Sequence, residues 1–216
     1  MIHSHRTEPE PLPAYAHMWN KETAYIVGGG PSLRGFDWSL LKDKHVIAIN
    51  RAYEAVPNAE VLFWMDDAFF AEHSMGLEHH KAKYKISVSP LFLSNDRSKE
   101  LGVTLLYWEG LRGLAEDVTK VCTGKNSGYA AINLAFHFGV SKIVLLGYDM
   151  CEDTGVSHWH SGYTYNYRPR KLLKYLPWFS NLVGPLKRWN VEVVNACPGS
   201  LLDCFPKATL EEVFLE

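Results

Sequence analysis

The sequence lacks the features of several protein classes. Its 216 residues contain no run of about 20 apolar residues, the length that a membrane-spanning helix needs. The first 20 residues carry Glu8, Glu10 and prolines where a signal peptide has its apolar core. The formal net charge is only −2, so composition gives no general reason to expect nucleic-acid binding. These absences predict a cytoplasmic protein without a membrane-spanning segment.

Cysteine is also scarce. The four cysteines (Cys122, Cys151, Cys197 and Cys204) include no C-x-x-C pair, which argues against a zinc knuckle and favours reduced, packed thiols. Apolar residues make up 47% of the chain. That fraction is ample for a core that needs neither disulfides nor a metal ion to hold it.

Short apolar runs alternate with segments of helical spacing. Residues 24–27, 45–50, 60–66, 84–89, 103–109, 142–149 and 191–197 form nearly continuous apolar runs, which are typical of strands buried on both faces of a parallel sheet. Residues 127–138 and 172–189 have helical spacing; Gly139 ends the first, and Pro177 and Pro185 break or kink the second.

This alternation predicts the α/β class, with a single Rossmann-like domain. We expect a mostly parallel, twisted sheet with helices on both faces. The domain should span residues 21–216, after a flexible arm at residues 1–20. Residues 150–180 should form an inserted segment at the active site.

Three glycines stand where the first predicted strand leaves the sheet. Glycine allows a bulky anion to approach the backbone closely, and ligands of open α/β sheets bind along this edge. Ser32 can cap the following helix, whose free N–H groups favour phosphate. The turn Gly28-Gly29-Gly30-Pro31-Ser32 is therefore predicted to bind a nucleotide, and the alternative interpretation is a tight turn without a ligand.

Polar residues follow other predicted strands at the same edge. Because the carboxyl ends of parallel strands face the same way, their side chains should converge on one cleft. Asn and Asp are also common turn and cap residues, so each alone is a weak signal. The residues predicted to line the cleft are Asn50, Asp66, Asp67 and Asp149, together with Asn126 and Ser127 at a helix start.

The segment after Asp149 is rich in histidine, tyrosine and basic residues. Imidazoles can move protons at neutral pH, so we predict His158, His160 and Asp66 as catalytic residues. Phenols and cations can stabilise a phosphate leaving group. For that role we predict Tyr163, Tyr165, Arg168 and Lys171.

Several motifs resemble a known family. The segments VGGGPSL, VLFWMDDAFF, NSGYAAINLAFHFGVSKIVLLGYDM and NACPGSLLDCF, with the Asn50 of AINRAY, are similar to those of bacterial sialyltransferases of glycosyltransferase family 42. The likeness runs from about residue 24 to residue 205. It implies a CMP-sugar donor lying along Gly29 and Gly30, bonded to Asn50 and enclosed by Asn126, Ser127 and Gly128. It also implies a homo-oligomer.

The chain also resembles the related archaeal 6-hydroxymethylpterin diphosphokinases. This resemblance rests on the glycine-Pro-Ser turn and on the Gly-x-x-His segment from Gly155 to His158. The sialyltransferases have a general-base histidine that falls near Leu173, where this sequence has none.

Three functions follow. The first is a glycosyltransferase that uses a nucleotide-sugar, preferably of the CMP type, and needs no metal. The second is a pyrophosphokinase in which Asp66, Asp67 and Asp149 hold Mg²⁺ on ATP phosphates. The third is a nucleotide-binding protein without catalytic activity. The acceptor of either transfer reaction stays unidentified.

Overall fold

A computed structural model describes residues 13–88, 99–150, 158–160 and 169–214. Its main sheet has seven strands in the order β5-β4-β3-β2-β1-β8-β9, and every neighbouring pair is parallel. The strands of this sheet are β1 (Thr23–Val27), β2 (His45–Ile49), β3 (Val61–Trp64), β4 (Tyr84–Ser87), β5 (Val103–Leu105), β8 (Lys142–Leu146) and β9 (Glu192–Asn195).

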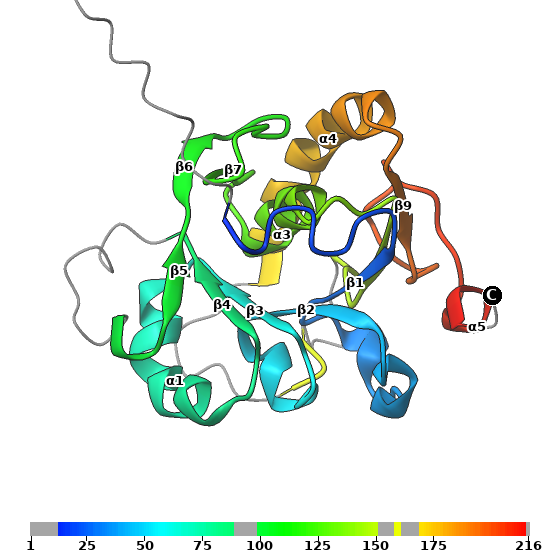
Figure 1. The fold of residues 1–216 in the computed structure, drawn as a ribbon. Helices are drawn as coiled ribbons and strands as arrows, with labels where there is room; N and C mark the ends of the chain where they lie inside the picture. Colours follow the sequence, from blue (N-terminus) through cyan, green and yellow to red (C-terminus); the bar gives the residue numbers. More distant parts are fainter. Residues whose placement is uncertain (1–12, 89–98, 151–157, 161–168, 215–216) are drawn as a thin grey trace, which may run out of the picture.

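Helices cover both faces of this sheet. Figure 1 shows α3 (Ser127–His137) and α4 (Leu176–Arg188) on one face and α1 (Asp67–His79) on the other. Each face has its own apolar core: Tyr129 and Phe179 belong to one, and Phe69 to the other. The predicted α/β class with a mostly parallel sheet is therefore confirmed. The remaining elements are α5 (Leu210–Phe214) and the 3-10 helices η1 (Pro31–Leu33), η2 (Trp38–Leu41), η3 (Asn50–Glu54) and η5 (Pro169–Tyr175).

The run predicted as one strand at residues 103–109 is two strands in different sheets. Leu106 still donates its N–H to Ser87 of β4, but Tyr107 donates to Thr119. The chain thus changes partner after Leu106 and enters a two-stranded sheet of β6 (Tyr107–Gly110) and β7 (Lys120–Cys122). An apolar run alone does not reveal such a change of partner.

The prediction of a flexible arm at residues 1–20 is wrong for residues 13–20, the part of it that the structure describes. Tyr15 and Trp19 are 3% and 2% exposed, and both belong to the core. The backbone is bonded to the end of α3 as well, since His17 and Trp19 donate N–H groups to His137 and Phe138. Two aromatic anchors thus fix a segment whose prolines and polar residues suggested an arm.

The predicted helices form with small differences. Gly139 follows α3 with a φ of +80°, the left-handed conformation expected just past a helix end. Over residues 172–189, η5 ends at Tyr175 and α4 begins at Leu176 with Pro177 in its first turn, a position that tolerates proline. The helix continues through Pro185 to Arg188.

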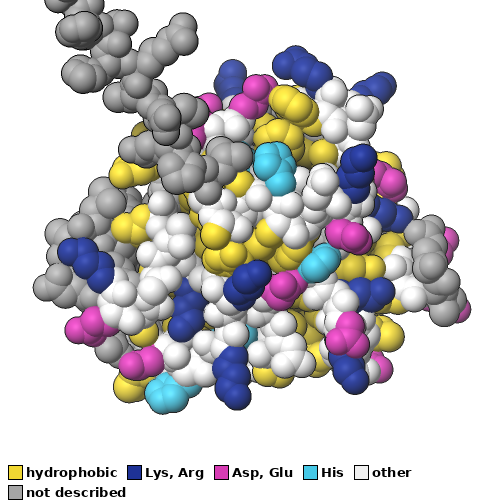
Figure 2. All heavy atoms as spheres, in the orientation of Figure 1, with side chains coloured by type: hydrophobic (Ala, Val, Ile, Leu, Met, Phe, Trp, Pro, Cys, Tyr) yellow, Lys and Arg dark blue, Asp and Glu magenta, His cyan; other side chains and the backbone are white. Residues whose placement is uncertain are grey.

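The face of the molecule drawn in Figure 2 carries mixed charge. Figure 2 shows Lys and Arg side chains interspersed with Asp and Glu side chains over the face that it draws. None of the described helices is both long enough and apolar enough to cross a bilayer.

Candidate functional site

A cavity of about 540 Å³ opens at the carboxyl edge of the sheet. It lies where β1 has β2 on one side and β8 on the other, which is the topological switch point at which open α/β sheets bind ligands. Its volume suits a small ligand or cofactor. Part of the lining comes from the carboxyl ends of strands and the residues after them, at β1 (28–30), β2 (49–52), β3 (65–67) and β8 (147, 148 and 150). The rest comes from residues 125–128 around the start of α3, from His158 and His160, and from the η5–α4 region (172, 175 and 179).

The glycine turn lines the cavity, but most of its backbone is bonded within the protein. Gly28 and Gly30 donate their N–H groups to Leu146 and Gly147. Trp159 donates its backbone N–H to the Gly29 carbonyl and its indole N–H to the Gly28 carbonyl. Among the described residues, the Gly29 N–H is the one donor of these three glycines without an acceptor. The turn can therefore offer a ligand little more than that group.

Side chains of the protein explain why this turn needs glycine. A Cβ on Gly29 would lie 2.6 Å from Cδ2 of His158, and a Cβ on Gly30 would overlap a carboxylate oxygen of Asp149. The sequence predicted that a phosphate would lie close to the backbone of this turn. In the structure, the imidazole of His158 and the carboxylate of Asp149 occupy that position.

Two residues predicted to bind the nucleotide, Ser32 and Asp149, bond to each other outside the cavity. The carboxylate of Asp149 is 5% exposed and accepts hydrogen bonds from the backbone N–H and the hydroxyl of Ser32, at 2.8 and 2.7 Å. Neither residue lines the cavity, and neither does Pro31. Ser32 also does not cap a helix, because it lies inside the three-residue η1. The structure therefore places Pro31, Ser32 and Asp149, which were predicted to contact a nucleotide, outside the lining of this cavity.

The start of α3 is the better-equipped anion site. Asn126 caps this 11-residue helix by accepting a hydrogen bond from the Tyr129 N–H at 2.8 Å. The N–H groups of Ser127 and Gly128 precede that bond and have no acceptor among the described residues. Free N–H groups and the helix dipole both favour an anion at this point. Tyr148 fixes the turn to β8 by donating its hydroxyl to the Gly128 carbonyl at 3.0 Å.

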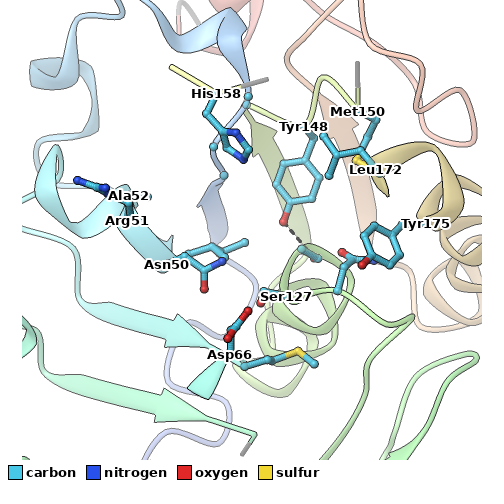
Figure 3. A pocket seen from close by; sticks show the side chains of 18 of the residues that line it. Asn50, Arg51, Ala52, Asp66, Ser127, Tyr148, Met150, His158, Leu172 and Tyr175 are labelled. Carbon is cyan, nitrogen blue, oxygen red and sulfur yellow. Dashed lines mark hydrogen bonds between the residues drawn. The ribbon is translucent and has the colours of Figure 1, made fainter. Parts of the chain in front are cut away.

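Asn50 lies in the wall across from the start of α3 (Figure 3). Its φ of +49° is left-handed, which asparagine tolerates better than most residues. Its side-chain Oδ1 is buried and has no hydrogen-bond partner among the residues that the structure describes. A buried acceptor without a donor costs free energy, which a donor group of a bound ligand would recover. The next residue, Arg51, is held by Glu54 through a bond of 2.9 Å from Nη2 to Oε2.

Two carboxylates stand at the start of α1. Asp66 caps that helix, since its Oδ1 accepts a hydrogen bond from the Ala68 N–H at 2.9 Å, and its side chain is exposed at the cavity. Asp67 lines the cavity beside it. The third carboxylate of the predicted magnesium set, Asp149, is bonded to Ser32 instead. Within the described ranges, no group of three or more His, Cys, Asp or Glu side chains is arranged to hold a metal ion.

His158 and His160 close another side of the cavity, and their ring centroids are 5.2 Å apart. Burial lowers the pKa of His158 from 6.5 to about 4. Burial, together with the charges of His158 and Arg51, lowers the pKa of His160 to about 4 as well. Both imidazoles are therefore neutral near pH 7. Figure 3 shows His158 and Asp66 at opposite ends of the cavity, with Asn50 and Ser127 between them.

The cavity brings together most of the predicted site. The predicted residues that line it are Gly28, Gly29, Gly30, Asn50, Asp66, Asp67, Asn126, Ser127, Gly128, His158 and His160. Tyr163, Tyr165, Arg168 and the side chain of Lys171 lie outside the described residues. The sequence prediction missed Arg51, Lys125, Tyr148 and Tyr175. Arg51 and Lys125 are the direct neighbours of Asn50 and Asn126 in the sequence. Their position beside a strand end and a helix start could therefore have indicated that they line the cavity.

Comparisons with protein-family models, with curated proteins and with solved structures find no match to this chain.

Proposed function

We propose that this cavity binds a nucleotide-sugar and that the protein is a glycosyltransferase. One observation carries the proposal: at the same cavity, two N–H groups at the start of α3 and the Oδ1 of Asn50 have no hydrogen-bond partner within the described part of the chain. The first group favours an anion, and the second needs a hydrogen-bond donor such as a hydroxyl. A nucleotide-sugar carries a phosphate and several hydroxyls within the span of a cavity of about 540 Å³.

Polar and apolar parts of the cavity lining can together orient the donor. Its phosphate is expected at Ser127 and Gly128, and a ribose or sugar hydroxyl at Asn50. The base is expected against the apolar wall, which includes Met150 and Phe179. A CMP-type donor is favoured by the sequence resemblance.

The transfer step then needs a base and stabilisation of the leaving group. The acceptor oxygen forms a bond to the anomeric carbon while the bond from that carbon to the phosphate oxygen breaks. The nucleoside phosphate leaves with the electron pair, and its charge lies at the start of α3. The acceptor proton passes to the neutral imidazole of His158. A phosphate nearby raises the pKa of that imidazole above its value in the free protein and so makes it a better base.

A magnesium-dependent pyrophosphokinase is the second candidate, and the lining of the cavity by Asp66 and Asp67 favours it. Mg²⁺ is commonly bound by one or two carboxylates together with substrate phosphates, so these two side chains fit the ion. The ion would neutralise phosphate charge during transfer. This candidate predicts that EDTA abolishes ATP binding and turnover, whereas the glycosyltransferase predicts no effect of EDTA.

A binding experiment tests the proposal. Thermal unfolding is measured with CMP, CDP, UDP, GDP and ATP, with and without EDTA. A nucleotide at a hundredfold excess over its Kd stabilises the folded state by about 2.7 kcal/mol. Asn50→Gly removes the orphaned side chain and allows the left-handed backbone, so it should weaken the best nucleotide about five- to tenfold.

Asn190→Gly is the matched control, because Asn190 is exposed, has a φ of +55° and does not line the cavity. It should leave nucleotide binding unchanged. If no nucleotide raises the unfolding midpoint, both enzymatic candidates fail. Nucleotide binding without transfer to any acceptor would leave a non-catalytic binding protein.

A further inference from the structure

Two cations share one aromatic ring at the rim of the cavity. The Arg112 guanidinium carbon lies 5.7 Å from the ring centroid of Trp178, and the Lys125 Nζ lies 5.3 Å from the same centroid. Both distances fall within the usual range of cation–π contacts. The two charges are therefore within about 11 Å of each other, the sum of the two distances.

The backbone holds this arrangement in place. Arg112 lies in the loop before β7 and Lys125 in the loop after it. Thr123 and Gly124 donate N–H groups to Gly110 and Leu111, so the two loops run together beyond the ends of β6 and β7. Trp178 lies in the first turn of α4, one residue before the cavity residue Phe179.

Neither cation is neutralised within the described part of the chain. No carboxylate lies within ion-pair distance of Arg112 or Lys125 there. Asp117, a carboxylate of the same loop as Arg112, pairs with Lys120 at 3.0 Å and accepts hydrogen bonds from Thr119. The positive end of α3 adds to the field, since Lys125 stands two residues before its first residue.

We propose that Arg112, Trp178 and Lys125 form a second anion subsite, which binds a carboxylate or phosphate group carried by the acceptor. This proposal rests on the proposed function, because it assigns the start of α3 to the phosphate of the donor. Lys125 lines the cavity and Arg112 does not, so the pair extends outward from the donor site. An acceptor with an anionic group would thus be held at the mouth with its reactive hydroxyl directed inward.

Calorimetric titration at 50 mM salt tests the subsite with defined probes. Glucose 6-phosphate and glucuronate are the anionic probes, and glucose is the neutral one, each titrated into protein saturated with its best nucleotide. The two anionic probes should bind and glucose should not. Arg112→Gln and Lys125→Gln should each weaken the anionic probes about fivefold, near the upper end of the effect of one exposed ion pair.

Lys187→Gln, an exposed position at the far end of α4, is the control and should leave the affinities unchanged. At 500 mM salt the differences between wild type and variants should vanish, because exposed charges are then screened. Arg112→Gln should also leave the affinity for CMP unchanged, which separates this subsite from the donor site.

Two results would overturn the subsite while leaving the proposed function standing. One is nucleotide binding with anionic probes that fail to bind or that bind all variants equally. The other is a loss of affinity for nucleoside di- or triphosphates in both variants with anionic sugars unaffected, since the pair would then serve the donor. Failure of every nucleotide to bind would instead refute the proposed function.

Discussion

Replacing Gly30 with alanine should destabilise the fold even when no ligand is present. The added Cβ would overlap a carboxylate oxygen of Asp149 and approach the Gly147 carbonyl oxygen to 2.5 Å. The backbone of Gly30 is extended, with φ −64° and ψ 151°, so alanine meets no conformational strain there. The cost therefore comes from the contacts alone.

The magnitude follows from what Asp149 must give up. Its carboxylate holds the N–H and the hydroxyl of Ser32, and each hydrogen bond to a charged group contributes roughly 1.5–3 kcal/mol. Moving the carboxylate breaks both bonds in a setting where Asp149 is 5% exposed and water replaces them poorly. We expect a loss of about 3 kcal/mol or more, which lowers the unfolding midpoint of a chain of this length by roughly 6–12 °C.

Urea unfolding without ligand measures this loss. Gly199→Ala is the control, because a Cβ there meets no heavy atom within 4 Å and should change stability little. Ser32→Ala removes the hydroxyl bond alone and should cost less than Gly30→Ala. A Gly30→Ala protein within about 0.5 kcal/mol of wild type would refute the reasoning, and close approach of a ligand would again be the better reason for this glycine.

Two further variants test other parts of the structure. Asn133→Ala removes the buried Oδ1 that accepts the N–H groups of Ala115 and Cys122, so urea unfolding should show a loss of about 2–6 kcal/mol; Asn181→Ala, a partly exposed helix position, should lose under about 1 kcal/mol. The pKa of His158 is about 4 in the folded state and 6.5 in the unfolded state. Between these two pH values the unfolded state binds more protons than the folded state, so stability falls as the pH drops from 6.5 towards 4. His158→Gln should flatten that decline and lower turnover more than donor affinity, and an unchanged slope with unchanged turnover would exclude His158 from the proposed mechanism.

The strands could be predicted because a strand buried on both faces must be apolar throughout. Most of the predicted runs became strands, and the carboxyl ends of β1, β2, β3 and β8 form the cavity edge as expected. The three-residue β7 is too short to show a pattern, and α1 was not assigned although Asp66 caps it. Its buried face depends on a few residues such as Phe69 and Leu77, so the helical signal in the sequence is weak.

The direction of a polar side chain was harder to predict than its position. Asp66 and Asp149 both follow apolar runs, yet Asp66 lines the cavity and Asp149 does not. The difference is Ser32, a partner 117 residues away from Asp149 along the chain. A contact of that range is a property of the packed structure, and a pattern of adjacent residues does not contain it.

The bonding of the glycine turn changes where the charge of a ligand is expected. The carbonyls of Gly28 and Gly29 accept hydrogen bonds from Trp159. The N–H groups of Gly28 and Gly30 donate to carbonyls at the end of β8. A phosphate at this turn would find one N–H group, whereas at the start of α3 it would find two together with the helix dipole. Since each hydrogen bond to a charged group is worth about 1.5–3 kcal/mol, the helix start should outcompete the turn for the phosphate. The turn then serves to hold His158 against the cavity, so substitutions at Gly29 should act through the imidazole before they act on the phosphate.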